Sequence, residues 1–353
     1  MSLVNVSANI SPLSKQTTIV LLGTGTVGSA FLNRFARLQK NQQAKNLRLV
    51  QVSNTRHSLR DFLGLDPDQV PEDLSNTAPD SLEQVARSLG YAGIIIDATA
   101  SDEVAAWHSR WLASGLKVVT ANKAGTGGKL TSFEIINHQI KNYGDAATVG
   151  AGLPLLRSLR ELRSGGDSIH GIAGILSGSL AWLFNNYDGM RPFSSFVREA
   201  RSLGYTEPDP RIDLSGQDVK RKLLILARNA GYPLETDDIQ VESLLPPELA
   251  TVDLPDVDSQ LEALDAPLRT RFLAAHRVGR RLRFIARLNH AGQARIGLEE
   301  LSPEDPLANG SGCDNRVAIW SDRYPSNALV IQGPGAGAEV TAAALLDDVL
   351  RLA

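Results

Sequence analysis

The sequence predicts an α/β protein in which a doubly wound parallel sheet comes first and an α+β domain follows. Three observations lead to this prediction. A glycine-rich turn joins an apolar strand to a helix near the start of the chain, and strand and helix patterns then alternate to about residue 145. The later strands instead alternate polar and apolar residues, which is typical of antiparallel sheets with one solvated face.

The glycine-rich turn lies in the stretch "TTIVLLGTGTVGSAF", directly after the apolar strand at 19–22. In a G-x-G-x-x-G turn the first glycine permits the tight turn, the second lets the backbone approach a pyrophosphate, and the third lets the helix pack closely on the strand. The N-terminus of the helix faces the phosphates. The turn therefore predicts a Rossmann-type dinucleotide site, to which we assign Gly23, Thr24, Gly25, Thr26, Val27 and Gly28.

Further strands follow in "LRLVQVS", "AGIIIDATAS" and "LKVVTANKAG", with a helical pattern through "EVAAWHSRWLASG". Ligands of doubly wound sheets lie beyond the carboxyl ends of the strands. This rule predicts that Ala98, Thr99, Ala100 and Lys123 lie at this edge and contact the coenzyme. Position alone leaves open whether Lys123 is a functional lysine or a surface residue of a connecting loop.

The end of the second strand indicates which nicotinamide coenzyme is used. Enzymes that prefer NAD usually carry Asp or Glu there, which holds the ribose 2′-hydroxyl and repels a 2′-phosphate. This chain has Ser53 and Asn54, and Arg56 follows. We therefore predict that Asn54 and Arg56 contact the coenzyme, that NADP(H) is preferred and that NAD(H) is also possible. The alternative is that Arg56 is a solvated loop residue.

The stretch "TEPDPRIDLSGQDVKRKL" gathers carboxylates and then a lysine. Its prolines hold the first acids extended, because a residue before proline avoids the helical region. A helix capped by Ser215 or Gly216 then makes Asp218 and Lys222 neighbours four residues apart. The face continues into apolar residues, so Lys222 is expected at the edge of a buried region, where a lysine can donate a proton. The alternative is a solvated intrahelical ion pair.

The second half begins with "AATVGAGLPLLRSLREL", a glycine-rich turn that opens a helix, and it continues with the strands "SIHGIAGILSG", "RLRFIARLNH", "ARIGLEEL", "RVAIWSD" and "NALVIQG". The proline-containing region at 245–265 is expected to be an irregular surface excursion or a lid. We thus predict a leader at 1–16, a dinucleotide-binding domain at 17–145, a substrate domain at 146–332 and a C-terminal helix at 333–353 that packs back on the first domain.

Composition excludes several classes of function. A net charge of -3 over 353 residues argues against a nucleic-acid binder. No window approaches the roughly 20 apolar residues that cross a bilayer, and the leader lacks the pattern of a secretory signal. Cys313 is the only cysteine and the histidines are scattered, which disfavours disulfides and zinc. We expect a soluble cytoplasmic protein that acts on a small molecule.

Together the motifs "GTGTVGSAF", "DATAS", "VVTANKAG", "TVGAGLPLL", "GILSGSLAWLF", "GYTEPDPRIDLSGQDVKRKL" and "GPGAGAEVTAAALLDDVL" resemble the homoserine dehydrogenase family over nearly the whole chain after the leader. The resemblance implies reduction of L-aspartate 4-semialdehyde to L-homoserine by a reduced nicotinamide coenzyme. This reaction belongs to threonine, methionine and isoleucine biosynthesis.

The resemblance also implies roles for individual residues. Lys222 would protonate the nascent alkoxide and Asp218 would orient it, while Lys123 matches the second active-site lysine of the family; which lysine gives the proton stays open. The residues matched to substrate binding are Glu207, Asp213, Gly178 and Ser179. A monovalent cation, Na⁺ or K⁺, would bind backbone oxygens in the stretch that contains Ala146, Val149, Ala151 and Leu153, although relatives often carry glutamate where this chain has Ala146.

The resemblance is closest to the dehydrogenase half of bifunctional aspartokinase/homoserine dehydrogenases. Because the closing helix reaches Ala353 and leaves no room for a kinase or a sensing domain, we expect a monofunctional enzyme that threonine does not inhibit. The family also implies a homodimer, with 146–332 as the substrate-binding and dimerisation domain. Two alternatives are an amino-acid dehydrogenase that acts on an amine and a coenzyme-binding regulator without catalysis; Asp218 and Lys222 disfavour the latter.

Overall fold

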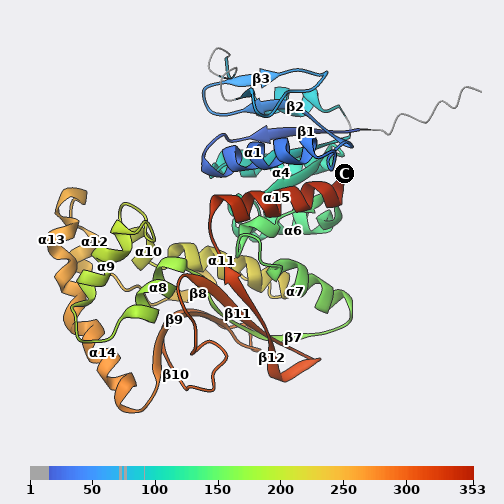
Figure 1. Cartoon of the computed structure of the whole chain (residues 1–353). Coiled ribbons are helices and arrows are strands. Elements are labelled where there is room, and N and C mark those ends of the chain that lie inside the picture. Colours follow the sequence, from blue (N-terminus) through green and yellow to red (C-terminus); the bar gives the residue numbers. More distant parts are fainter. Residues whose placement is uncertain (1–15, 71–73, 75–77, 91) are drawn as a thin grey trace, which may run out of the picture.

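The structure is a computed structural model that describes residues 16–70, 74, 78–90 and 92–353. The predicted leader lies outside the described residues apart from Gln16. Figure 1 shows two lobes, each built around one sheet, with helix α11 (Gln217–Asn229) running between them. Among the described residues, no helix is both long and apolar enough to cross a membrane.

The first lobe contains a six-stranded sheet in the order β3-β2-β1-β4-β5-β6. All neighbouring strands are parallel except β3, which pairs antiparallel with β2 at the edge. The sheet confirms the predicted doubly wound, Rossmann-type fold. Its strands are β1 (Thr17–Leu22), β2 (Leu47–Ser53), β3 (Ser58–Arg60), β4 (Gly93–Asp97), β5 (Lys117–Thr120) and β6 (Tyr143–Gly144).

Helices cover both faces of this sheet because its strands are apolar on both sides. Ile19 and Leu21 of β1 pack into a core with α1 and α15, whereas Val20 and Leu22 pack into a core with α3, α4 and α6. The helix α15, at the end of the chain, therefore lies beside α1 on the first lobe (Figure 1). The helices are α1 (Thr26–Lys40), α3 (Leu82–Ser88), α4 (Asp102–Ala113), α5 (Ala124–Gly127), α6 (Leu130–His138) and α15 (Ala338–Leu352).

The second lobe contains a six-stranded sheet in the order β12-β11-β7-β9-β10-β8. Neighbouring strands are antiparallel, as the alternating patterns predict, except for the parallel pair of β8 and β10. The strands are β7 (Ile169–Ile175), β8 (Ile239–Val241), β9 (Arg281–Leu288), β10 (Ala294–Leu301), β11 (Asp314–Ser321) and β12 (Tyr324–Pro334).

A helical layer packs on this sheet and shares one large core with it. It contains α7 (Leu155–Ser164), α8 (Gly178–Asn186), α9 (Phe193–Ser202), α10 (Arg211–Leu214), α11, α12 (Pro247–Ala250), α13 (Val257–Gln260) and α14 (Asp265–Arg277). Short 3₁₀ helices connect several elements, at η2 (Ile140–Asn142), η3 (Ala146–Thr148), η4 (Thr236–Asp238), η5 (Leu254–Asp256) and η6 (Leu261–Leu264).

Residues 245–265 are not irregular as expected, although most of them lie at the surface. This region consists largely of the short helices α12, η5, α13 and η6. Leu249, Val257 and Leu261 are buried in the core of the second lobe. Each helix is shorter than two turns and buries at most two apolar side chains, so no helical period is visible in the sequence.

Candidate functional site

The glycine-rich turn has the geometry that a bound dinucleotide requires. Gly23 has φ +94°, and a Cβ there would lie 2.8 Å from the carbonyl oxygen of Ala98. A Cβ on Gly28 would overlap the carbonyl oxygen of Gly23 at 1.9 Å, so only glycine lets α1 approach β1 this closely. A Cβ on Gly25 would meet nothing within 4 Å, which leaves space beside the N-terminus of α1. The turn thus fits a pyrophosphate, with the first backbone N–H groups of α1 as donors.

Asn54 ties the end of β2 to this turn. Its side-chain amide donates to Thr24 Oγ1 at 2.9 Å, and its Oδ1 accepts the backbone N–H groups of Arg56 at 2.8 Å and His57 at 2.9 Å. These bonds hold the Arg56 backbone near the glycine-rich turn. The Arg56 side chain is exposed and forms no ion pair with another described residue. Its guanidinium is therefore available to an anionic ligand.

The buried carboxylate of Asp97 organises the loops that follow β4 and β5. Asp97 Oδ1 accepts the backbone N–H of Thr99 at 2.9 Å and its hydroxyl at 2.6 Å. Asp97 Oδ2 lies 3.0 Å from both Asn122 Nδ2 and His108 Nε2. One carboxylate thus fixes both the loop that contains Ala98, Thr99 and Ala100 and the turn that carries Lys123.

Two lysines from different lobes meet at one carboxylate. Lys222 Nζ lies 2.8 Å from Asp218 Oδ2 and donates to the carbonyl oxygen of Leu176 at 2.7 Å. Lys123 Nζ, which comes from the first lobe, lies 3.2 Å from Asp218 Oδ1. Lys222 is only 8% exposed, whereas Lys123 is partly exposed. The structure therefore brings together all three residues that the sequence suggested for catalysis.

The charge on Asp218 is stabilised by these lysines. Burial opposes ionisation of the carboxyl group, but the ammonium groups of Lys222 and Lys123 outweigh it and lower the pKa of Asp218 to about 2. Asp218 is consequently ionised at neutral pH and can hold both ammonium groups through electrostatic attraction and hydrogen bonds.

Asp213 and Glu207 differ in what they are free to bind. Asp213 Oδ1 accepts the hydroxyl of Ser179 at 2.6 Å, and its Oδ2 accepts the backbone N–H of Glu207 at 2.9 Å. Asp213 thus connects the first turn of α8, where Gly178 and Ser179 lie, to the Glu207 loop. The carboxylate of Glu207 is exposed and forms no ion pair with another described residue. Glu207 is therefore the carboxylate that remains available to a cationic ligand.

The stretch expected to hold a cation forms η3 and the turn that leads from it to α7. Gly150 has φ +75° and Ala151 φ +51°, a left-handed conformation that costs a non-glycine residue about 1 to 2 kcal/mol. The Ala146 N–H donates to Asp348 Oδ2 at 3.0 Å, and the Leu153 carbonyl accepts the Leu155 N–H at 2.8 Å. Val149, between them, is fully buried. Across the described chain, no cluster of three His, Cys, Asp or Glu side chains could hold a metal ion.

Sequence reasoning missed several residues of the site. His108 and Tyr143, joined by a 2.8 Å contact between His108 Nδ1 and the Tyr143 hydroxyl, are fully buried beneath the Lys123 turn. Leu176 contributes only its carbonyl oxygen, and Ser177 caps α8. Of these, only Ser177 has a signal in the sequence, because serine before a helical pattern is a common N-cap.

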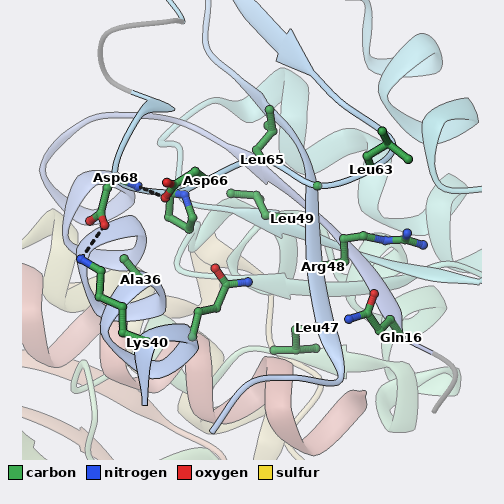
Figure 2. A pocket seen from close by; sticks show the side chains of 13 residues that line it. Gln16, Ala36, Lys40, Leu47, Arg48, Leu49, Leu63, Leu65, Asp66 and Asp68 are labelled. Atoms are coloured by element: carbon green, nitrogen blue, oxygen red, sulfur yellow. Dashed lines mark hydrogen bonds and ion pairs between the residues drawn. The ribbon is translucent and has the colours of Figure 1, made fainter. Parts of the chain in front are cut away.

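A separate pocket of about 530 Å³ lies near the amino-terminal ends of strands β1 and β2. Figure 2 shows it between the end of α1 and the loop after β3, with Lys40 paired to Asp68 at 2.6 Å and Arg48 at its side. Leu47 and Leu49, which line the pocket, lie at the start of β2. The glycine-rich turn lies at the other end of that strand, where the Gly23 N–H donates to the Ser53 carbonyl oxygen. This pocket is therefore separate from the glycine-rich turn.

Comparisons with known proteins identify both halves of the chain. The family model described as "Homoserine dehydrogenase, NAD binding domain" matches residues 23–145, and the model described as "Homoserine dehydrogenase" matches 154–350. The chain is 39% identical over 351 residues to bifunctional aspartokinase/homoserine dehydrogenase 2 of Escherichia coli, covering 96% of this chain but 43% of that protein.

Two further relatives are similar over their full length. Homoserine dehydrogenase of Emericella nidulans is 32% identical over 369 residues, which cover 94% of this chain and 97% of that enzyme. The crystal structure of a Candida auris protein of unknown function superposes with a TM-score of 0.89 at 31% identity, covering 96% of this chain and 98% of that one. With a matching family model over more than half of its length and a full-length relative, the chain belongs to the homoserine dehydrogenase family.

Proposed function

We propose that this protein reduces L-aspartate 4-semialdehyde to L-homoserine with a reduced nicotinamide coenzyme, a step of threonine, methionine and isoleucine biosynthesis. The observation that carries the proposal is the Asp218 carboxylate, which binds Lys123 of the coenzyme lobe and Lys222 of the second lobe. Cationic donors are needed where negative charge develops on a carbonyl oxygen during reduction.

The residues of this chain supply the proton. When bound, the reduced nicotinamide supplies a hydride to the carbonyl carbon. Lys222 uses two of its N–H groups on Asp218 and the Leu176 carbonyl, so the third can donate to the substrate oxygen. Lys123, at the same carboxylate, stabilises the charge that develops on that oxygen or exchanges roles with Lys222. Ionised Asp218 keeps both ammonium groups within reach of one atom.

Substrate recognition depends on the carboxylate of Glu207, which has no ion pair among the described residues, and on that of Asp213, which is already hydrogen-bonded within the protein. Glu207 binds the substrate ammonium group, because its carboxylate has no cationic partner among the described residues. Asp213 supports it indirectly by holding the Glu207 backbone and the Ser179 hydroxyl. Gly178 and Ser179 lie in the first turn of α8, whose N-terminus favours a negative group such as the substrate carboxylate.

NADP(H) is the preferred coenzyme in this proposal, and NAD(H) is the weaker one. The support is the exposed side chain of Arg56, whose backbone Asn54 holds near the glycine-rich turn, and the absence of a carboxylate at Ser53 and Asn54. A charge-assisted contact to the 2′-phosphate contributes about 1.5 to 3 kcal/mol, or roughly a tenfold to hundredfold preference.

Three further features complete the proposal. A Na⁺ or K⁺ ion binds backbone oxygens of Ala146, Val149, Ala151 and Leu153, and the left-handed backbone at Ala151 supports a specialised turn there. A homodimer forms through the second sheet, where the 11-residue strand β12 is an exposed edge that another chain can cover. The enzyme acts in the reducing cytoplasm, where its single cysteine stays free.

A steady-state assay tests the activity. L-Aspartate 4-semialdehyde with NADPH and with NADH, followed by nicotinamide absorbance, should give turnover, and L-homoserine should drive the reverse reaction. Oxidation of aspartate instead of homoserine would favour an amino-acid dehydrogenase that acts on an amine. Coenzyme binding without turnover of either would favour a coenzyme-binding regulator. Light scattering after gel filtration measures the mass of the assembly.

A further inference from the structure

The turn that carries Lys123 is anchored inside the first lobe by Asn122. The Asn122 amide donates to Asp97 Oδ2 at 3.0 Å and to the Ser101 carbonyl at 2.8 Å, and its Oδ1 accepts the Ala124 N–H at 3.0 Å. These bonds fix the start of the turn relative to the sheet of the first lobe. They do not fix it relative to α11, which carries Asp218 and Lys222.

Arg228, ten residues after Asp218 on α11, makes the connection to the second lobe. Its side chain is fully buried, and its Nη1 donates to the carbonyl oxygens of Thr126 and Gly128, both at 2.8 Å. Its Nε donates to the Leu234 carbonyl at 3.0 Å, which orients the guanidinium. Arg228 therefore binds two carbonyl groups in the short segment after Lys123.

Glu235 completes the contact on the same side. Its Oε2 lies 3.2 Å from Arg228 Nη2, and its two oxygens accept the Leu130 N–H at 3.1 and 3.2 Å. The Arg228 guanidinium thus lies at the carboxyl-terminal end of α5, and the Glu235 carboxylate lies at the amino-terminal end of α6. Each charge is the one that the helix terminus beside it favours.

Glycines make the turn fit closely between the two lobes. A Cβ on Gly125 would lie 2.5 Å from the Tyr143 hydroxyl and 2.7 Å from His108 Nδ1. A Cβ on Gly127 would lie 2.8 Å from Arg221 Cγ of α11. One face of the turn therefore packs against His108 and Tyr143 of the first lobe, and the other packs against α11.

We propose that Arg228 is a positioning residue for the reaction: by binding the Thr126 and Gly128 carbonyls, it holds the Lys123 turn against α11 so that Asp218 can bind Lys123 and Lys222 together. This proposal rests on the proposed function for its kinetic consequences. Two domains of one chain are expected to move relative to each other unless a large apolar interface prevents it. Displacement of a catalytic group by about 1 Å can cost about a hundredfold in rate.

Kinetics of Arg228→Met test the proposal, with Arg163→Met as a control at a second arginine that binds α11. Arg163 Nη1 donates to the Asn229 carbonyl at 3.1 Å, so it holds the last turn of the same helix without reaching the Lys123 turn. We expect Arg228→Met to lower kcat about tenfold to a hundredfold with coenzyme affinity nearly unchanged, and Arg163→Met to change kcat less than about threefold. Equal losses in the two variants would overturn the proposal.

A double-mutant cycle with Lys123→Met separates positioning from general destabilisation. If Arg228 acts through Lys123, then Arg228→Met should change kcat by less than about twofold once Lys123 is absent. A loss by the same factor in both backgrounds would refute the proposal. Arg228→Lys, which keeps the charge with fewer donors, enters the same cycle if Arg228→Met does not fold.

The reactivity of Lys123 provides a readout that needs no turnover. Reductive methylation followed by peptide mass spectrometry measures how fast the Lys123 amine reacts. Loss of its contact with Asp218 should raise this rate several-fold in Arg228→Met and leave it unchanged in Arg163→Met. Unchanged reactivity in both variants would refute positioning by Arg228, whatever the substrate. Absence of homoserine dehydrogenase activity in the wild-type protein would refute the proposed function alone.

Discussion

Substitution of Lys222 by methionine tests the proton donor most directly. Methionine keeps an unbranched stem and a similar helix propensity, so α11 can retain its packing while the ammonium group is lost. The structure predicts the loss of the contacts to Asp218 Oδ2 and the Leu176 carbonyl. A positioned general acid contributes about 10² to 10⁴ in rate, which corresponds to about 2.7 to 5.4 kcal/mol of activation free energy.

The stability of this variant can be estimated from the same contacts. Asp218 is half-exposed and keeps Lys123 as a partner, so the lost ion pair contributes no more than about 1 kcal/mol. The Leu176 carbonyl loses a buried donor, which costs about 1 to 3 kcal/mol. These amounts are smaller than the usual stability of a domain, about 5 to 15 kcal/mol, so the variant should fold and bind coenzyme.

The assay is semialdehyde reduction at saturating coenzyme, with kcat measured across pH for the wild type, Lys222→Met and Lys123→Met. Thermal unfolding and coenzyme fluorescence show that each variant is folded. A lysine that donates the proton makes kcat fall as pH rises through the pKa of the enzyme–substrate complex. The donor is therefore the lysine whose removal abolishes this alkaline fall. A kcat for Lys222→Met within about threefold of wild type would refute its role as the acid.

Three other substitutions have distinct expected outcomes. Glu207→Gln should raise KM for the semialdehyde about tenfold or more with little change in kcat, because the ammonium group does not react; a loss in kcat alone would contradict this role. Arg56→Ala should remove most of a roughly tenfold to hundredfold preference for NADPH, and a wild-type enzyme equally efficient with both coenzymes would exclude the contact. Because the pKa of Asp218 is lowered from 3.8 to about 2 in the folded protein, ionised Asp218 should stabilise the fold fully at pH values above 3.8. This stabilisation should disappear as the pH falls through about 2. Urea unfolding of Asp218→Asn should lack that part of the acid dependence, and an identical pH profile would contradict it.

The first lobe could be predicted because its signals are local. The glycine triplet of the turn, the apolar strands and the amphipathic helices each lie within one continuous segment. The missed strand β3 has only the residues Ser58–Arg60 and depends on its pairing with β2. In the second lobe, β8 is equally short and pairs parallel with β10, which comes much later in the chain. Such short strands form because a neighbouring strand pairs with them, and their own residues do not indicate which strand that is.

The site was predictable only in part for a similar reason. Asp218 and Lys222 are four residues apart on one helix, so their pairing can be derived from helix geometry. Lys123 comes from another lobe, and only the family resemblance suggested that it lies near them. Arg228 follows the same helical pattern as a surface arginine, and its burial depends on how α5 packs against α11. Contacts between lobes are therefore the part of the site that periodicity and spacing do not reveal.

The position of Asp218 between two lysines links the chemistry to the arrangement of the lobes. Two ammonium groups that face one substrate oxygen repel each other, and an ionised carboxylate between them offsets this repulsion. The partial burial of Asp218 alone would favour the neutral acid, yet its pKa is lowered to about 2, so the combined attraction of both lysines is the stronger effect. Asp218 and Lys222 share helix α11, whereas Lys123 belongs to the other lobe, so the contribution of Lys123 to this attraction exists only while the lobes are correctly packed. A substitution that separates them should therefore weaken proton donation even when every catalytic side chain is still present, and the Arg228 variants measure that effect.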